Sequence, residues 1–281
     1  MNKINKKRIL NKIFINFVAI VVVFVIAFPL IWLFTGGFKS KVEIWSIPPR
    51  WLPSKLTLDN FKKVFTVTYQ YNFLASMGST LLVALLSTVF GLFVNTLAAY
   101  AFARIDFRFK KILWILYLFP MFVPGITILL PSLKVVNDLK MTDTIFVLFV
   151  PGLASAYQTF FFRQFFLSIP APLEEAAEID GCNKISIFFR IFLPMSVTPL
   201  IIQGVGIFMA YWNSYLWPSL TVTGNKNLQQ LTQVINLLST QNRGEYGITI
   251  AAALVSLIPP LIIFGILQKK IVEGITLSGL K

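Results

Sequence analysis

The residues best suited to chemistry are four carboxylates in one short stretch, Glu174, Glu175, Glu178 and Asp180. Grouped carboxylates can transfer protons or bind a metal cation. The rest of the sequence offers them no co-ligands, because the chain has no histidine and a single cysteine, Cys182. That composition also excludes a disulfide framework. We therefore expect no catalytic residue and no metal site, and we interpret the acidic stretch as a solvated surface.

The acidic stretch has the features of a short helix. Pro170 and Pro172 suit a helix start, and Glu174 and Glu175 follow in the first turn, where carboxylates complement exposed backbone amides. A helix is therefore predicted over about residues 172–180.

A tight turn and a second helix should follow. Ala176 and Ala177 keep one flank of the first helix thin, so that another backbone can come close. Gly181 can adopt the left-handed conformation that ends a helix, and Asn183 is placed to cap the next one. Pro194 marks the entry into a further apolar run. The apolar residues of the second helix are Ile185, Ile187, Phe188, Phe189, Ile191 and Phe192.

These helices must be positioned by a membrane domain. The 281 residues are 56% hydrophobic and 13% charged, with 28 phenylalanines and a mean hydropathy of +0.75. Apolar runs of about 20 residues match the thickness of a bilayer, which predicts an all-α membrane protein. Six such runs occur, at residues 13–34, 73–103, 112–130, 144–162, 195–220 and 248–267. Internal proline and glycine predict either ordinary kinks in a helix bundle or, for some of them, the lining of a water-accessible path.

Basic residues set the expected orientation, because short loops rich in Lys and Arg stay in the cytoplasm. They precede the first run, crowd the turn between the second and third, and follow the sixth. Both termini are therefore predicted to be cytoplasmic. The net charge of +14 fits attraction to anionic lipid headgroups and not nucleic-acid binding, because no basic stripe lies on a soluble domain. The residues are Lys3, Lys6, Lys7, Arg8, Lys12, Arg104, Arg108, Lys110, Lys111, Lys269 and Lys270.

Two external segments are long enough to have structure of their own. Residues 38–72 contain a proline-rich turn and a Thr57-Leu58-Asp59 sequence that favours a short helix. Trp45 and Trp51 are expected at headgroup level. Residues 221–246 are polar, and we expect either a surface that meets a partner or ligand, or a merely solvated loop.

The central stretch resembles the signature loop of bacterial ABC importer permeases. Glu175-Ala176-Ala177, three residues, Gly181, nine residues, Ile191, one residue and Leu193-Pro194 match that signature without a spacing error. The flanking Asp180 and Phe188 are similar to its carbohydrate-importer version. Trp212-Asn213-Ser214-Tyr215-Leu216-Trp217-Pro218 resembles the fifth-span segment of sugar permeases. Residues 272–281 resemble the tail of the second permease subunit, the type exemplified by the smaller permease of the maltose importer.

The resemblance implies a type I ABC importer permease fold and a role in carbohydrate uptake, with an oligosaccharide as the expected substrate. It divides the chain into a basic N-terminus (1–12), a six-span permease domain (13–268) and a cytoplasmic tail (269–281). The permease domain contains the external segments 38–72 and 221–246 and the coupling helices 168–194. The location implied is the bacterial inner or plasma membrane. The ATPase-coupling residues implied are Glu174, Glu175, Ala176, Ala177, Asp180, Gly181, Ile191, Leu193 and Pro194, and the ATPase-contacting tail residues are Gly274, Thr276 and Gly279.

The partners implied are a second homologous permease, a cytoplasmic ABC ATPase dimer and an external solute-binding lipoprotein or periplasmic binding protein. ATP and Mg²⁺ would bind to the ATPase, and this chain would hold no cofactor. The 221–246 segment would reach toward the binding protein's ligand cleft.

Sugars are held by aromatic faces with a few amides and hydroxyls. Candidates within the spans could serve in this way or could make interhelical hydrogen bonds and interface anchors. They are Asn95, Gln203, Tyr211, Trp212, Asn213 and Tyr215.

Three other functions fit less well. An ABC permease for a non-sugar solute is disfavoured by the fifth-span segment and the tail. A self-sufficient secondary carrier should carry ionisable residues within its spans, and this chain has essentially none. A membrane enzyme would lack histidine and paired buried carboxylates.

Overall fold

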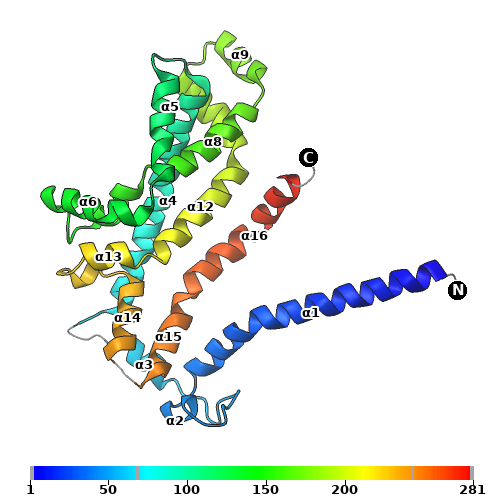
Figure 1. Ribbon diagram of the computed structural model, residues 1–281, viewed down its shortest axis with the longest axis vertical. Coiled ribbons are helices and arrows are strands. Elements are labelled where there is room, and N and C mark those ends of the chain that lie inside the picture. The colour runs from blue at the N-terminus through cyan, green and yellow to red at the C-terminus, as the bar shows by residue number, and fades with distance from the viewer. Residues whose placement is uncertain (1–2, 67–69, 242–243, 279–281) are drawn as a thin grey trace. The chain divides into compact units, whose positions relative to one another are not determined.

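The computed structural model describes residues 3–66, 70–241 and 244–278, and every regular element within these ranges is helical (Figure 1). Two compact units can be distinguished, residues 1–66 with 235–257, and residues 67–234 with 258–281. Each unit is described by itself below.

The first unit contains α1 (Lys3–Gly37), α2 (Lys41–Ile44), α3 (Asp59–Phe65), α15 (Tyr246–Ser256) and the end of α14 (Leu231–Gln241). The end of α1 packs on α15, where a Cβ added to Gly37 would lie 2.6 Å from the Leu254 side chain. The apolar stretch of α1 from Asn11 onward is otherwise exposed. An exposed helix of such hydropathy is suited to lipid or to another membrane helix.

The segment between α1 and α3 is ordered by polar contacts. The Asn60 side chain donates to the carbonyls of Gly37 and Lys39, at 3.0 and 2.8 Å. Lys39 is itself buried, and its Nζ donates to the Arg50 carbonyl at 2.6 Å. The short helix predicted from Thr57-Leu58-Asp59 is confirmed as α3, with Asp59 as its first residue.

The second unit is built on α4 (Phe73–Arg104), which packs along α8 (Ala156–Ser168) and α12 (Val197–Trp212), while α16 (Ile258–Ser278) lies against α12 (Figure 1). The remaining elements join these helices. They are α5 (Lys110–Leu118), η1 (Phe119–Phe122), α6 (Gly125–Asp138), α7 (Ile145–Phe149), η2 (Val150–Gly152), α9 (Ala171–Ile179), α10 (Lys184–Ile187), η3 (Phe188–Phe192), α11 (Leu193–Met195), α13 (Leu216–Thr221), η4 (Lys226–Leu228) and the start of α14.

Three of the predicted spans are long apolar helices, and three are bent. The helices at Asn11–Gly37, Phe73–Arg104 and Tyr246–Val272 are long enough to cross a bilayer. The other runs contain bends of 105°, 47° and 80° between successive helices, so up to six spans form if each bent pair counts as one. Pro124 and Pro151 lie at the first two bends, since proline lacks the N–H that a continuous helix needs.

One expected boundary and one alternative were wrong. The run predicted at 195–220 ends as a helix at Trp212, because the Asn213 side chain turns back to donate to the Met209 carbonyl at 2.9 Å. The alternative of a merely solvated loop at 221–246 is also excluded. That segment contains η4 and α14, whose Leu231 and Val234 are fully buried.

Candidate functional site

The predicted helix and turn at the centre of the chain are confirmed as α9 and the residues after it. Gly181 has a φ of +81°, and its N–H bonds to the Glu178 carbonyl at 3.0 Å. The Cys182 N–H bonds to the Ala177 carbonyl at 2.9 Å. A Cβ at position 181 would meet no other atom within 4 Å. The dihedral angle and not lack of space therefore requires glycine here.

The second helix begins with the predicted cap. The Asn183 side chain accepts a hydrogen bond from the Ser186 N–H at 2.8 Å. After one turn of α10 the chain forms a π-helical turn, η3, and only then the short α11 with Pro194. The chain bends by 80° before α12. Such π-turns are rare and occur often at functional sites.

A cluster of buried aromatic side chains packs against α9. Phe166, Phe188 and Phe192 are almost fully buried there, and Ala177 packs against them with 8% of its surface exposed. Phe166 and Phe192 meet edge to face at 5.4 Å. Ala177 therefore faces the chain's own core, where its small side chain allows α9 to lie close.

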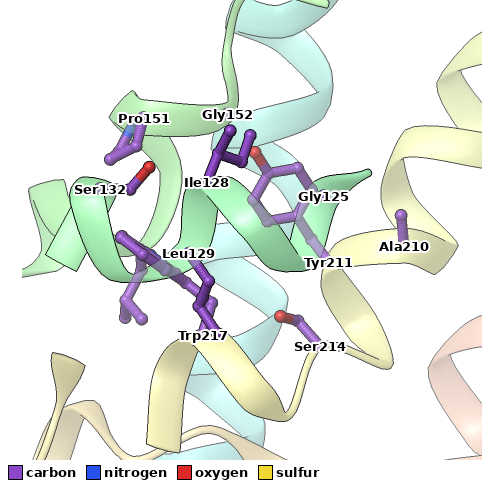
Figure 2. Close-up of a pocket in the computed structure, with 11 residues that line it drawn as sticks. Gly125, Ile128, Leu129, Ser132, Pro151, Gly152, Ala210, Tyr211, Ser214 and Trp217 are labelled. Carbon is purple, nitrogen blue, oxygen red and sulfur yellow. The ribbon is translucent and has the colours of Figure 1, made fainter. Parts of the chain in front are cut away.

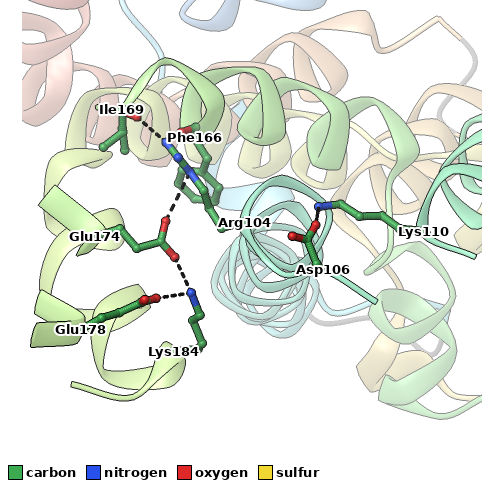
Figure 3. Close-up of polar contacts among 8 residues, drawn as sticks. All are labelled: Arg104, Asp106, Lys110, Phe166, Ile169, Glu174, Glu178 and Lys184. Atoms are coloured by element: carbon green, nitrogen blue, oxygen red, sulfur yellow. Dashed lines mark hydrogen bonds and ion pairs between the residues drawn. The ribbon is translucent and has the colours of Figure 1, made fainter. Parts of the chain in front are cut away.

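Charged side chains lock α9 to two other helices (Figure 3). Arg104, at the end of α4, lies 3.8 Å from the Glu174 carboxylate and donates to the carbonyls of Phe166 and Ile169 at the end of α8. Lys184 completes the network with Glu174 at 3.0 Å. The side chains of Arg104 and Glu174 are only 12% and 10% exposed.

Glu174 therefore differs from the solvated carboxylate that the sequence predicted. It is a buried anion held between two cations, which is how a buried charge is tolerated. Lys184 also pairs with Glu178. The carboxylates of Glu178 and Glu174 together raise the pKa of Lys184 above its ordinary value of 10.5. Its charge is thus secure at neutral pH.

The outer side of α9 carries different residues. Glu175, Ala176 and Asp180 are exposed, and so are two large apolar side chains, Leu173 at 44% and Ile179 at 86%. We call these five residues the α9 outer face. A mixture of exposed apolar and acidic side chains on a short helix suits insertion into a groove of another protein. Of the remaining coupling candidates, Ile191 and Leu193 are half-buried against the aromatic cluster and Pro194 is exposed.

The six sugar-path candidates fall into different environments. Asn95 is fully buried, and its side chain bonds to Gly91, Leu153, Ser155, Gln158 and Thr159. Trp212 is buried and stacked on Phe208 at 5.6 Å. Asn213 is engaged with the end of its own helix, and Tyr215 is 43% exposed. Gln203 and Tyr211 line a cavity.

Tyr211 stands between two cavities. One has a volume of about 370 Å³ and is lined by residues of α6, α7, η2, α12 and α13 (Figure 2). Its walls are mostly apolar, with the hydroxyls of Ser132 and Ser214 and the Trp217 ring. Figure 2 shows the Tyr211 ring reaching toward Gly152, where an added Cβ would lie 2.0 Å from the tyrosine hydroxyl. The second cavity, on α4, α8 and α12, is considered below.

The predicted tail lies at the end of the described chain. Gly274 and Thr276 belong to the last turns of α16, and Gly279 lies outside the described residues. Among the described residues no group of three or more His, Cys, Asp or Glu side chains is arranged to hold a metal ion.

Comparison with known proteins identifies the family. Residues 87–276 match the model of the binding-protein-dependent transport system inner membrane component. The chain belongs to this family. As a member, it is a membrane transport subunit and not an enzyme, and ATP hydrolysis belongs to a separate subunit. The predicted location in the cell membrane is confirmed by the same match.

Relatives with assigned roles cover nearly all of this permease. It is 29% identical over 262 residues to the arabinooligosaccharides transport system permease protein AraQ of Halalkalibacterium halodurans, covering 92% of this chain and 93% of that protein. It is 30% identical to the sn-glycerol-3-phosphate transport system permease protein UgpE of Escherichia coli O1:K1, covering 94% and 95%.

A solved structure shares the fold. A chain of the bacterial ABC transporter that imports the acidic polysaccharide alginate has a TM-score of 0.81 and 19% identity, covering 96% of this permease and 98% of that chain. A structure of a bacterial alginate ABC transporter in complex with its periplasmic protein gives a TM-score of 0.63, at 16% identity, covering 95% of this permease and 96% of that chain. The all-helical ABC permease fold expected from the sequence is thereby confirmed.

Sequence reasoning missed the residues that anchor the permease's α9. Arg104 was interpreted only as a charge that sets membrane orientation. The sequence did contain a sign that Glu174 faces inward, because it lies one position before the Glu-Ala-Ala signature, on the side of α9 opposite Ala176. The Arg104 contact, however, joins residues 70 positions apart, which local spacing does not reveal.

Proposed function

We propose that this permease is one of two membrane subunits of a binding-protein-dependent ABC importer for a carbohydrate. A second homologous permease completes the channel, an ATPase dimer drives it with ATP and Mg²⁺, and an external binding protein delivers the solute. Relatives named for arabinooligosaccharides and for sulfoquinovosyl glycerol, both carbohydrates or their derivatives, support the substrate class.

The single observation that carries the coupling role is the anchoring of α9. Its inner side is fixed to α4 and α8 through Glu174, Arg104 and the aromatic cluster, while its outer face is exposed. A partner that binds the α9 outer face and then moves will therefore displace the ends of α4 and α8 together. Glu175, Ala176 and Asp180 are the contact residues in this proposal, and Glu174, Ala177 and Gly181 hold the contact surface in shape.

The topology proposed has six spans, each bent helix pair counting as one, with both termini in the cytoplasm. The boundaries are those of the basic N-terminus at 1–12, the permease domain at 13–268 and the tail at 269–281. The coupling helices at 168–194 then face the ATPase. The tail residues Gly274, Thr276 and Gly279 are proposed to lie between the two ATPase subunits, and the 221–246 segment to meet the binding protein.

The test is to purify the chain from its native membrane in mild detergent and to identify what accompanies it by mass spectrometry. We expect an ATPase and a second permease. Ile179→Asp on the α9 outer face should lose the ATPase but keep the second permease. The matched control is Ile47→Asp, since Ile47 is 96% exposed in the external segment. Recovery of the wild-type chain alone would refute the importer assignment, and ATPase retention by Ile179→Asp would refute the docking role of α9.

A further inference from the structure

The second cavity beside Tyr211 is unusually polar for the interior of a membrane bundle. It has a volume of about 400 Å³ and is lined by residues of α4, the η2–α8 break and α12. Its polar lining consists of Ser87, Tyr157, Gln158, Gln203 and Tyr211. Ligand pockets in proteins begin at about 300 Å³, so the cavity has room for a sugar residue.

Two of these polar groups make no hydrogen bond of normal geometry to any described residue. Ser87 is 1% exposed, and its hydroxyl has no hydrogen bond of normal geometry to any described residue. The nearest candidate partner for the Ser87 hydroxyl is Tyr211, which lines the same cavity. Gln203 is 8% exposed, and its side-chain amide has no hydrogen bond within the described chain. Buried polar groups are nearly always paired, and each exception calls for an explanation such as a bound ligand or water.

The nearby Asn95 shows that the bundle does satisfy a buried amide when it serves only the fold. Its side chain makes hydrogen bonds to α4, to both sides of the η2–α8 break and to Thr159. Gln203, on the neighbouring helix α12, lines the cavity and makes no hydrogen bond to a described residue, so its donor and acceptor capacity is unused. The contrast separates a structural amide from one available to a solute.

Glycines keep the cavity open. Gly206 lines it, and a Cβ added there would meet nothing within 4 Å. Gly91 and Gly152 also line it, and a Cβ at Gly152 would collide with the Tyr211 hydroxyl. Gly206 is exposed, so a side chain there would project into open space at the edge of the cavity without disturbing the helix packing.

No charged side chain is among the residues that line either cavity beside Tyr211. Taking an anion from water into such a site without a counter-charge is costly. Hydroxyl groups, in contrast, can exchange hydrogen bonds with amides, serines and tyrosines at little net cost, and the tyrosine rings offer apolar faces to a sugar ring. The chemistry of the lining therefore selects an uncharged, hydroxyl-rich solute.

We propose that Ser87, Gln203 and Tyr211 form a contact site for an uncharged saccharide within this permease, on its path through the membrane. This inference rests on the proposed importer function and adds a solute class and a location. It sets the protein apart from relatives named for glycerol phosphate and from the permease for the acidic polysaccharide alginate, whose solutes are anionic.

Cysteine accessibility tests the site without relying on transport. In a Cys182→Ser background, which removes the single cysteine, Gly206→Cys is introduced into the assembled importer in proteoliposomes and treated with a charged, water-soluble maleimide. The probes are an arabinooligosaccharide, sn-glycerol 3-phosphate and an alginate oligosaccharide, each with the binding protein and ATP. We expect labelling at Gly206→Cys and protection by the neutral sugar alone. The matched control is Gly265→Cys on α16. A Cβ added at Gly265 also meets no other atom within 4 Å, and this cysteine should not be labelled.

Uptake of the same solutes provides the second measurement. Gly206→Leu should abolish uptake while ATPase stimulation by the loaded binding protein persists, whereas Gly265→Leu should leave both unchanged. Gln203→Leu should lower uptake by roughly tenfold, the cost of one hydrogen bond to a neutral group. Labelling without protection by any solute, protection by the anionic solutes only, or normal uptake by Gly206→Leu would each overturn the site. Absence of transport of every saccharide by the wild-type importer would instead overturn the proposed function.

Discussion

Replacing Arg104 with methionine should release α9 from the helices that it joins. Methionine keeps most of the side-chain volume but removes the ion pair to Glu174 and both hydrogen bonds to the end of α8. At a separation of 3.8 Å, two unit charges attract by about 4 kcal/mol in a medium of effective dielectric constant near 20. Leaving the Glu174 carboxylate buried with one cation fewer has a similar cost, about 3–5 kcal/mol.

The lower end of that range applies here, because Lys184 still lies 3.0 Å from Glu174 after the substitution. Lys184 is 46% exposed, so its pairing is screened by solvent and compensates only in part. A loss of about 3 kcal/mol corresponds to an increase of roughly a hundredfold in the opening of α9.

Hydrogen exchange followed by mass spectrometry on the detergent-solubilised importer measures this opening directly. Amides of residues 171–181 should exchange faster by up to about two orders of magnitude, and those in the middle of α4 should be unaffected. Arg108→Met is the matched control, since Arg108 lies in the same turn and contacts the Phe109 ring instead of α9. Equal exchange of α9 in the two variants would refute the anchoring role of Arg104.

Other perturbations have equally definite outcomes. Gly181→Leu places a side chain at φ +81°, at a cost of about 1–2 kcal/mol. It should weaken stimulation of the ATPase, measured in proteoliposomes, more than the control Cys182→Ala does. Asp143→Ala removes the acceptor of three backbone N–H groups, of Thr223, Gly224 and Asn225, so exchange of those amides should rise while α9 is unchanged. Burial alone would raise the pKa of Asp143, but the three donors outweigh it and leave the pKa below 3.8. That contribution to stability is therefore present above pH 3.8 and is lost as the pH falls through the lowered value, and a loss nearer neutral pH would contradict this account.

The sequence was sufficient wherever a local rule determines the structure. The turn at Gly181 and the cap at Asn183 follow from residue types and spacing, and both were correctly placed. The sequence was insufficient where a distant partner decides. The burial of Glu174 and the end of α12 at Trp212 each depend on contacts or turns that hydropathy does not encode. The bend after Pro151 agrees with the kinks that internal proline predicted, but its angle of 47° does not follow from hydropathy.

The break between η2 and α8 shows why such a feature has to be supported from elsewhere in the chain. Pro151 and Gly152 interrupt the helix inside an apolar run, and the interruption leaves the Leu153 carbonyl and the Ser155 N–H without helical partners. In lipid these groups must be satisfied by the protein itself. Asn95 bonds to both, at 2.8 Å each, from a helix about 60 positions earlier. The amide thus makes the bend possible, and the bend places Gly152, which lines the polar cavity, beside Tyr211. Asn95, which satisfies the backbone at the break, and the unpaired Ser87 and Gln203 at the cavity are therefore two parts of one arrangement. In our proposal the first stabilises the bend and the others contact the solute.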